Sequence, residues 1–388
     1  MYVARLLGPW LKHPFWRSAF EVDEDDARRI RASGIDAVVI DTSRGLDLDT
    51  EAPAAHPAGD AAAPARAPRP PAGDTSTVDF RDEIIRARRI CEEGYSVVSG
   101  LFTQARLGEA VDPERALPLV EAINRSVLRN PAAMLSVARL KTADTYTYLH
   151  SVSTCALMTA LARTLGLDEE QTREAGMGGL LHDLGKAVMP MDVLNKPGRL
   201  TDEEFTVIRQ HPVAGERMLR EAGVGNQAVL DIALHHHEKV DGSGYPDRLA
   251  GDAISLMARM GAVCDVYDAV TSDRPYKQGW DPAEALGRMV SWEGHFDMDV
   301  LKALIRSLGI YPVGALVRLA SQRLAVVTAQ TPGALLKPTV KAFYSLKSNT
   351  QIHVREIDLA APGCQDRILG PESPSNWNFR NLEKLWMP

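Results

Sequence analysis

The chain has 388 residues, of which 45% are hydrophobic and 24% are charged, and its formal net charge is −7. This length allows two or three domains with cores of their own, and the composition is that of an ordinary globular protein. The acidic charge argues against a nucleic acid polymer as partner, since such partners require a strongly basic surface.

Targeting signals and cysteine pairs are not evident. The N-terminal stretch MYVARLLGPWLKHPFW lacks the charged region and apolar core of a signal peptide. No apolar run reaches the roughly 18–20 residues that cross a bilayer. Four scattered cysteines form no CxxC pair, which indicates free thiols in a reducing compartment. We therefore expect a cytoplasmic protein that does not contact membranes.

Residues 1–50 predict a small α+β domain. MYVARLL (1–7) and IDAVVID (35–41) are typical of strands, and DEDDARRIRASG (23–34) lies between them and is typical of a short helix. Residues 51–77 are mostly Ala and Pro without a periodic apolar face, which is the composition of a solvated linker.

Residues 78–312 predict a helical domain. Apolar residues recur every three or four positions in DFRDEIIRARRICEEGYSVVSGLF (79–102) and in DTYTYLHSVSTCALMTALARTLG (144–166). Residues 313–388 predict a β-rich appendage, because ALVRLAS, LAVVTAQ, VKAFYSL and QIHVREIDL alternate or run short between turn residues. The expected fold class is therefore mainly α, with a small α+β domain before the helices and a β-rich appendage after them.

Residues that could bind metal ions recur in the helical domain. Imidazole and carboxylate together suit Fe, Mn or Zn, and a carboxylate can bridge two metals. His182 and Asp183 are adjacent and cannot share one face of a regular helix, so we expect the helix to end there, with Gly185 supplying the end. One histidine in a helix is usually a core or surface residue, but so many in apolar helical contexts favour a metal site. The candidates are His150, His182, Asp183, His211, His235, His236, His237 and Asp265.

These residues resemble a known family. His150, the pair in LLHDLGK and Asp265 resemble the H…HD…D pattern of the HD superfamily of metal-dependent phosphohydrolases. HHEKVDGSGYP (236–246) resembles the HHExxDGxGYP motif of its HD-GYP subfamily without a mismatch, and the likeness extends over about residues 120–312. MYVARLLGPWLKHPF and GIDAVVIDTSRG resemble a domain of unknown function that is often fused ahead of HD-GYP modules.

The resemblance implies an HD-type helical bundle that hydrolyses cyclic di-GMP to pGpG, GMP or both, through a hydroxide bridging two divalent metal ions, with Fe or Mn expected. Some members carry a Glu for a third metal where this chain has Tyr146, so we expect two metals. Asp183 would bridge them. The implied metal ligands are His150, His182, Asp183, His211, His236, His237 and Asp265.

The resemblance also implies residues that contact the substrate. Lys186 matches a lysine that contacts the scissile phosphate and acts in catalysis beside Asp183, and Arg274 and Lys277 match positions that grip phosphate. Tyr245 lies in the glycine-rich DGSGYP loop, where it would pack on the substrate or on a partner, such as a diguanylate cyclase with a GGDEF domain.

Three residues near the metal ligands are expected to have other roles. His235 stands one position before the HH of the motif and should point elsewhere, because consecutive helical residues turn by about 100°. Glu238 and Asp241 are expected to fix the loop rather than to bind metal.

The sequence leaves alternatives open. A catalytically silent protein that senses cyclic di-GMP or docks a partner would keep the fold, although the complete ligand set argues against it. A phosphodiesterase for another cyclic dinucleotide would keep the chemistry. The physiological metal, the end product and a homodimer also stay open.

Overall fold

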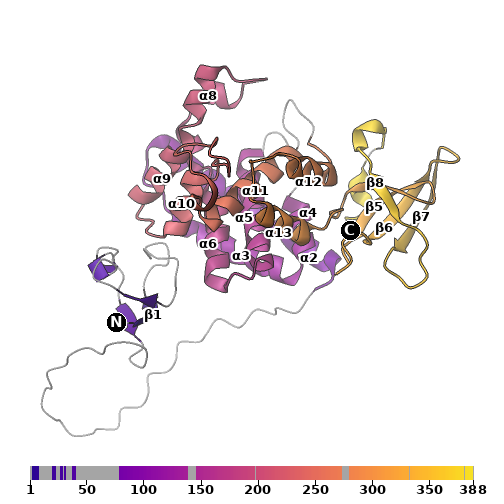
Figure 1. The fold of residues 1–388 in the computed structure, drawn as a ribbon, viewed down its shortest axis with the longest axis horizontal. Helices are drawn as coiled ribbons and strands as arrows, with labels where there is room; N and C mark the ends of the chain where they lie inside the picture. The colour runs from indigo at the N-terminus through magenta and orange to yellow at the C-terminus, as the bar shows by residue number, and fades with distance from the viewer. Residues whose placement is uncertain are drawn as a thin grey trace, which may run out of the picture.

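The computed structural model describes residues 2–7, 20–22, 27–28, 30–31, 37–40, 78–138, 146–196, 198–272, 279–331, 333–379 and 381–387. Within these ranges a helical body is followed by an antiparallel sheet toward the C-terminus, as Figure 1 shows. The mainly α fold with a β-rich appendage is therefore confirmed. No helix among the described residues is long and apolar enough to cross a membrane.

The N-terminal strands form a small antiparallel sheet. Its order is β2-β1-β3, with β1 at Tyr2–Leu7, β2 at Phe20–Glu21 and β3 at Ala37–Ile40. The strands predicted at 1–7 and 35–41 are confirmed. The helix predicted at 23–34 is described only at residues 27–28 and 30–31, which are helical, and its other residues lie outside the described part.

The helical body places one buried helix at its centre. Helix α5 (Tyr146–Thr164) is buried at every position from 150 to 162, and it packs on α6, α2 and α11. Its buried positions include polar side chains, among them His150, Ser151 and Thr154. The other helices are α2 (Phe80–Leu107), α3 (Leu117–Arg129), α4 (Pro131–Ala138), α6 (Glu169–Leu181), α7 (Met191–Leu194), α8 (Asp202–Ile208), α9 (His211–Glu221), α10 (Gln227–His235), α11 (Leu256–Thr271), α12 (Pro282–Val290) and α13 (Met298–Leu308).

The segment that follows α6 makes a close backbone contact with α9. Helix α6 ends at Leu181, and the chain continues into a 3-10 helix, η4 (Leu184–Val188). The expectation that Gly185 caps the helix is wrong, because this glycine lies inside η4. A Cβ atom there would lie 2.0 Å from the carbonyl oxygen of His211 and 2.5 Å from the amide nitrogen of Gly215. Gly185 is needed because α9 lies against its backbone.

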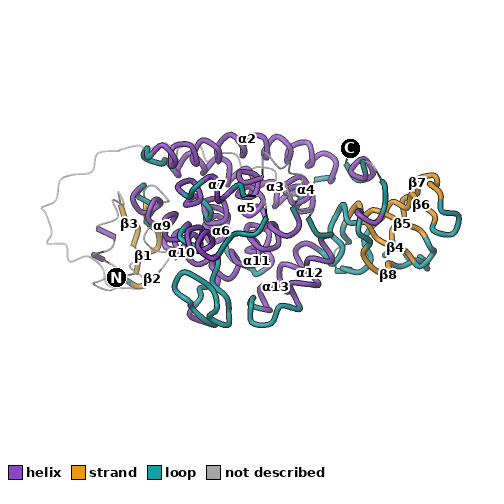
Figure 2. The backbone as a smooth tube through the Cα atoms, turned by 90° about the horizontal axis from the view of Figure 1, so that it is seen from above, coloured by secondary structure: helices purple, strands orange, loops and turns teal. Residues whose placement is uncertain are grey.

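The C-terminal appendage is a five-stranded antiparallel sheet with the order β7-β6-β5-β4-β8, seen beside the helices in Figure 2. Four of its strands were predicted, and β8 was missed because it is short and contains Gly and Pro. The strands are β4 (Leu316–Leu319), β5 (Arg323–Ala329), β6 (Thr339–Ser345), β7 (Thr350–Asp358) and β8 (Ile368–Pro371).

A buried carboxyl group joins α6 to α10. Glu174 is fully buried, and its Oε1 accepts a hydrogen bond of 2.8 Å from Nδ2 of Asn226, the N-cap of α10. Burial raises the pKa of Glu174 to about 8. Burial therefore favours the protonated acid at neutral pH, although the hydrogen bond from Asn226 works in the opposite direction.

The Gly185→Ala variant should lower the free energy of unfolding by about 1–3 kcal/mol or more, because an added methyl group overlaps backbone atoms that cannot rotate away. Gly287→Ala is the matched control, since a Cβ atom there meets nothing within 4 Å. That variant should be neutral or stabilising, by up to about 1 kcal/mol. Urea unfolding of the metal-free proteins measures both, and equal stabilities would contradict the contact.

Glu174 makes stability depend on pH. The folded protein holds a proton that the unfolded chain has released between pH 4.5 and about 8, so this contribution to the free energy of unfolding is lost as the pH rises through that window. Glu174→Gln keeps the acceptor for Asn226 and cannot ionise. Urea unfolding near either end of this pH window measures the free energy of unfolding of both proteins. The variant should be more stable relative to the wild type at the higher pH than at the lower pH. An equal difference in stability at both pH values would refute the assignment.

Candidate metal centre

The seven predicted ligands form two adjacent groups, and within each group the potential ligand atoms lie within 4.8 Å of one another. The side chains come from the middle of the helical body: from α5, the end of α6, the start of α9, the end of α10 and α11. All are buried except His237, which is partly exposed. One group is His150, His182 and Asp265, and the other is Asp183, His211, His236 and His237.

The Asp183 carboxylate faces both groups. Its Oδ2 lies 3.5 Å from Nε2 of His150 and 3.4 Å from Nε2 of His182. Its Oδ1 lies 3.3 Å from Nε2 of His211 and 3.8 Å from Nε2 of His236. One oxygen toward each group is the arrangement of a carboxylate that bridges two cations.

Nearby backbone carbonyl oxygens orient three of the histidines. The Nδ1 atoms of His182 and His211 lie 2.8 and 2.7 Å from the carbonyl oxygens three residues earlier, and that of His236 lies 3.0 Å from the carbonyl four residues earlier. Each ring therefore turns Nε2 toward the centre. His150 differs, because its Nδ1 lies 2.6 Å from Oδ2 of Asp268 on α11.

The protonation states of His236 and His237 suit metal binding. Burial lowers the pKa of His237 to about 3 and that of His236 well below its usual value. Both imidazoles are therefore neutral at physiological pH, which is the form that binds metal. Burial alone would also lower the pKa of His182, but the neighbouring Asp183 and Asp265 carboxylates raise it to about 10.

Two buried atoms at the centre have no hydrogen-bond partner among the described residues: Nε2 of His182 and Oδ1 of Asp183. Leaving such atoms unsatisfied is costly in a protein interior. Burial works against ionisation of Asp183, yet Lys186 and His182 hold its pKa well below the usual range. Ligand atoms without hydrogen-bond partners, neutral imidazoles and ionised carboxylates together fit divalent metal ions.

Lys186 and Tyr245 lie at the edge of the centre. Lys186 is partly exposed, and its Nζ lies 2.5 Å from Oδ2 of Asp183. The ring of Tyr245 stacks on His237 with centroids 4.7 Å apart. Arg209 covers the tyrosine, with its guanidinium carbon 4.7 Å from the ring centroid. Arg209 was not predicted, although its place two residues before a ligand histidine was a signal.

The remaining predicted residues fall outside this description. Arg274 and Lys277 lie outside the described residues. Tyr146 begins α5, but its side chain is not described. Asp268 was overlooked, and its position three residues after Asp265 on one helix could have indicated it.

The DGSGYP loop is held by its own carboxylates. Oε1 of Glu238 accepts a hydrogen bond of 2.7 Å from the amide of Asp247, and Oδ1 of Asp241 accepts one of 2.8 Å from the amide of Ser243. Gly242 has a φ of +77°, which favours glycine. The expectation that these two acids fix the loop is confirmed.

His235 points away from both metal-competent groups. Its Nδ1 lies 2.6 Å from Oδ1 of Asp231 and its Nε2 lies 3.0 Å from Oδ2 of Asp247. It therefore ties α10 to the segment that follows the loop, as the turn of the helix predicted.

Neighbouring histidines should behave differently when changed. His236→Gln should reduce the Mn(II) bound per chain, because it removes a ligand atom, whereas His235→Gln should leave the metal content unchanged. Elemental analysis of the reconstituted proteins after desalting measures both. Equal losses in the two variants would place His235 at the metals and contradict the geometry.

Two family models match the chain. An HD domain matches residues 127–300, and a domain of unknown function (DUF3391) matches residues 1–116. A curated cyclic di-GMP phosphodiesterase of Pseudomonas aeruginosa is 51% identical over all of this chain and 92% of its own length. The cyclic di-GMP phosphodiesterase response regulator RpfG of Xanthomonas campestris pv. campestris is 37% identical over 60% of this chain and 62% of its own length.

A third relative has a different substrate in its name. A 3′3′-cGAMP-specific phosphodiesterase of Vibrio cholerae is 35% identical over 45% of this chain and 41% of its own length. Only the Pseudomonas relative among these three is matched over nearly its full length. From that similarity, the HD domain match and the HHEKVDGSGYP motif, we conclude that the chain belongs to the HD-GYP family of cyclic di-GMP phosphodiesterases.

Proposed function

We propose that this protein is a two-metal phosphodiesterase that hydrolyses cyclic di-GMP to pGpG, GMP or both. The observation that carries the proposal is the Asp183 carboxylate, which turns one oxygen to each of two groups of metal-competent residues. The Pseudomonas relative, matched over the whole of this chain, supports cyclic di-GMP as the substrate.

The proposed metal ligands would be His150, His182 and Asp265 at one position and His211, His236 and His237 at the other, with Asp183 shared. When bound, two divalent cations would lower the pKa of a shared water molecule and neutralise charge on the phosphate. Donors of this kind, without thiolates, support Fe(II) or Mn(II) as the ions.

Lys186 contributes a positive charge beside the Asp183 carboxylate. It is partly exposed and bonded to Asp183, so its ammonium group could move from that carboxylate to an incoming phosphate oxygen. Tyr245 is proposed to pack on the substrate, because its ring lies at the edge of the centre against His237. We keep Arg274 and Lys277 as proposed phosphate-binding residues.

Several predictions stay proposals. They include a cytoplasmic location, a homodimer and a GGDEF diguanylate cyclase that contacts the DGSGYP loop. They also include domain boundaries at 1–50, 51–77, 78–312 and 313–388. A second candidate function, hydrolysis of another cyclic dinucleotide, is favoured by the similarity to the Vibrio cholerae enzyme named for 3′3′-cGAMP.

Protein reconstituted anaerobically with Fe(II) or Mn(II) should hydrolyse cyclic di-GMP faster than 3′3′-cGAMP, with the products separated by chromatography. Asp183→Ala should reduce the rate by more than the roughly 10–100-fold that losing an outer-shell partner costs. Asp299→Ala changes an exposed carboxylate on α13 and should keep the wild-type rate.

The outcomes separate the candidate functions. Faster turnover of 3′3′-cGAMP would move the assignment to that substrate. Binding of cyclic di-GMP without turnover by the two-metal protein would establish a sensor instead. A rate that survives Asp183→Ala would remove the shared carboxylate from the chemistry.

A further inference from the structure

We propose that Asp268 is a positioning residue that makes the two metal positions unequal, with the tighter position at His150. The proposal rests on the two-metal site of the proposed function, and it concerns metal binding rather than hydrolysis. Asp268 is 3% exposed, and its Oδ2 lies 2.6 Å from Nδ1 of His150, the ring atom opposite Nε2.

The partners of the rings differ in charge. The Nδ1 partners of His182, His211 and His236 are neutral backbone carbonyl oxygens, whereas the partner of His150 is a carboxylate on another helix. A carboxylate on the far nitrogen fixes the orientation of a metal-binding imidazole and raises its basicity. His150 should therefore be a stronger ligand than the other three.

The two positions also differ in their own charge. The group of His150 contains the Asp265 carboxylate in addition to Oδ2 of Asp183, with Nε2 of His150 3.0 Å from Oδ1 of Asp265. The group of His211 contains the shared Asp183 carboxylate beside three imidazoles, and Oδ2 of Asp265 lies farther away, 3.8 Å from Nδ1 of His237. Asp268 adds further negative charge on the side that already carries more. Both differences favour a dication at His150.

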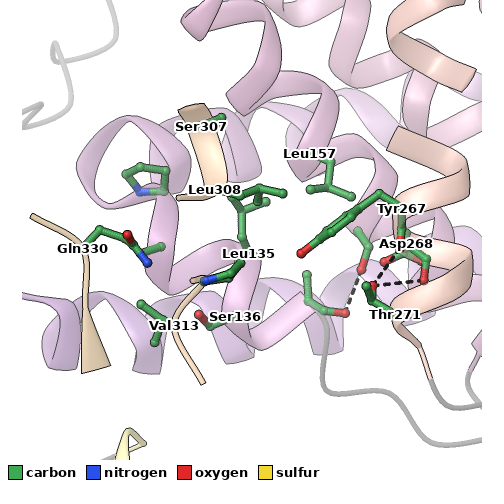
Figure 3. Close-up of a pocket in the computed structure, with 15 residues that line it drawn as sticks. Leu135, Ser136, Leu157, Tyr267, Asp268, Thr271, Ser307, Leu308, Val313 and Gln330 are labelled. Atoms are coloured by element: carbon green, nitrogen blue, oxygen red, sulfur yellow. Dashed lines mark hydrogen bonds between the residues drawn. The ribbon is translucent and has the colours of Figure 1, made fainter. Parts of the chain in front are cut away.

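The surroundings of Asp268 keep its effect local. Asp268 lines a cavity of about 110 Å³ at the junction of the helices with the C-terminal appendage. Figure 3 shows Tyr267, Asp268 and Thr271 on one side of this cavity, with Val313 and Gln330 on the other. The cavity is smaller than the roughly 300–1,000 Å³ of pockets that bind drug-sized ligands, so it does not take a cyclic dinucleotide. The contact with Nδ1 of His150 is what links Asp268 to the metal position.

Anaerobic titration of the metal-free protein with Mn(II) alone tests the proposal, because free Mn(II) is measured directly by electron paramagnetic resonance. The wild type should show two unequal affinities. Asp268→Asn should weaken the tighter one by about 10–100-fold and leave the weaker one unchanged. In a His150→Ala background, Asp268→Asn should have no further effect, because the residue it acts through is gone.

Controls separate positioning from folding. Asp297→Asn removes a carboxylate that binds Arg259 at the start of α13, and it should keep both affinities. Urea unfolding of the metal-free variants checks the fold, and Asp268→Ser carries the same test if Asp268→Asn does not fold. Two equal affinities in the wild type, or equal weakening of both in Asp268→Asn, would overturn the proposal. Either result is obtained without substrate, so it does not depend on whether cyclic di-GMP is hydrolysed.

Discussion

The structure around the centre depends on one buried charge, the carboxylate of Asp183. An ionised acid in a protein interior is unfavourable unless positive charge surrounds it. Here Lys186 and the histidine rings lie close to its two oxygens. Dications at the two groups would supply further positive charge. The close backbone contact at Gly185 serves the same end, because it brings the start of α9 against the segment that carries Asp183.

The helical body holds this charge in place through its most buried element. Helix α5 carries His150 and is surrounded by α6, α2 and α11, so that neither the histidine nor its neighbours can shift without disturbing the core. Helix α11 and the end of α6 contribute metal-competent residues to the same group. The same contacts between helices therefore form the hydrophobic core and position the metal-competent residues. Rigid elements position ligands more accurately than loops do.

Much of this could be predicted from sequence, and the rest depended on three-dimensional contacts. Helical periodicity predicted the helical domain, and the family resemblance indicated the seven candidate metal ligands that the structure brings together. The reason for Gly185 could not be predicted, because it is defined by a neighbour distant along the chain. Strand β8 was missed because it is short and contains Gly and Pro. The spacing from Asp265 could have indicated Asp268, but not its partner His150, which lies 118 residues earlier. A local sequence pattern indicates which face of an element is buried, but not which other element packs against that face.

That separation of 118 residues has a consequence for biosynthesis. The His150 side of the centre lacks Asp265 and its outer carboxylate until α11 has left the ribosome. A nascent chain that ends before α11 holds only the histidines and Asp183, which form a weaker ligand set. All seven metal-competent residues can therefore come together only after α11 has been synthesised.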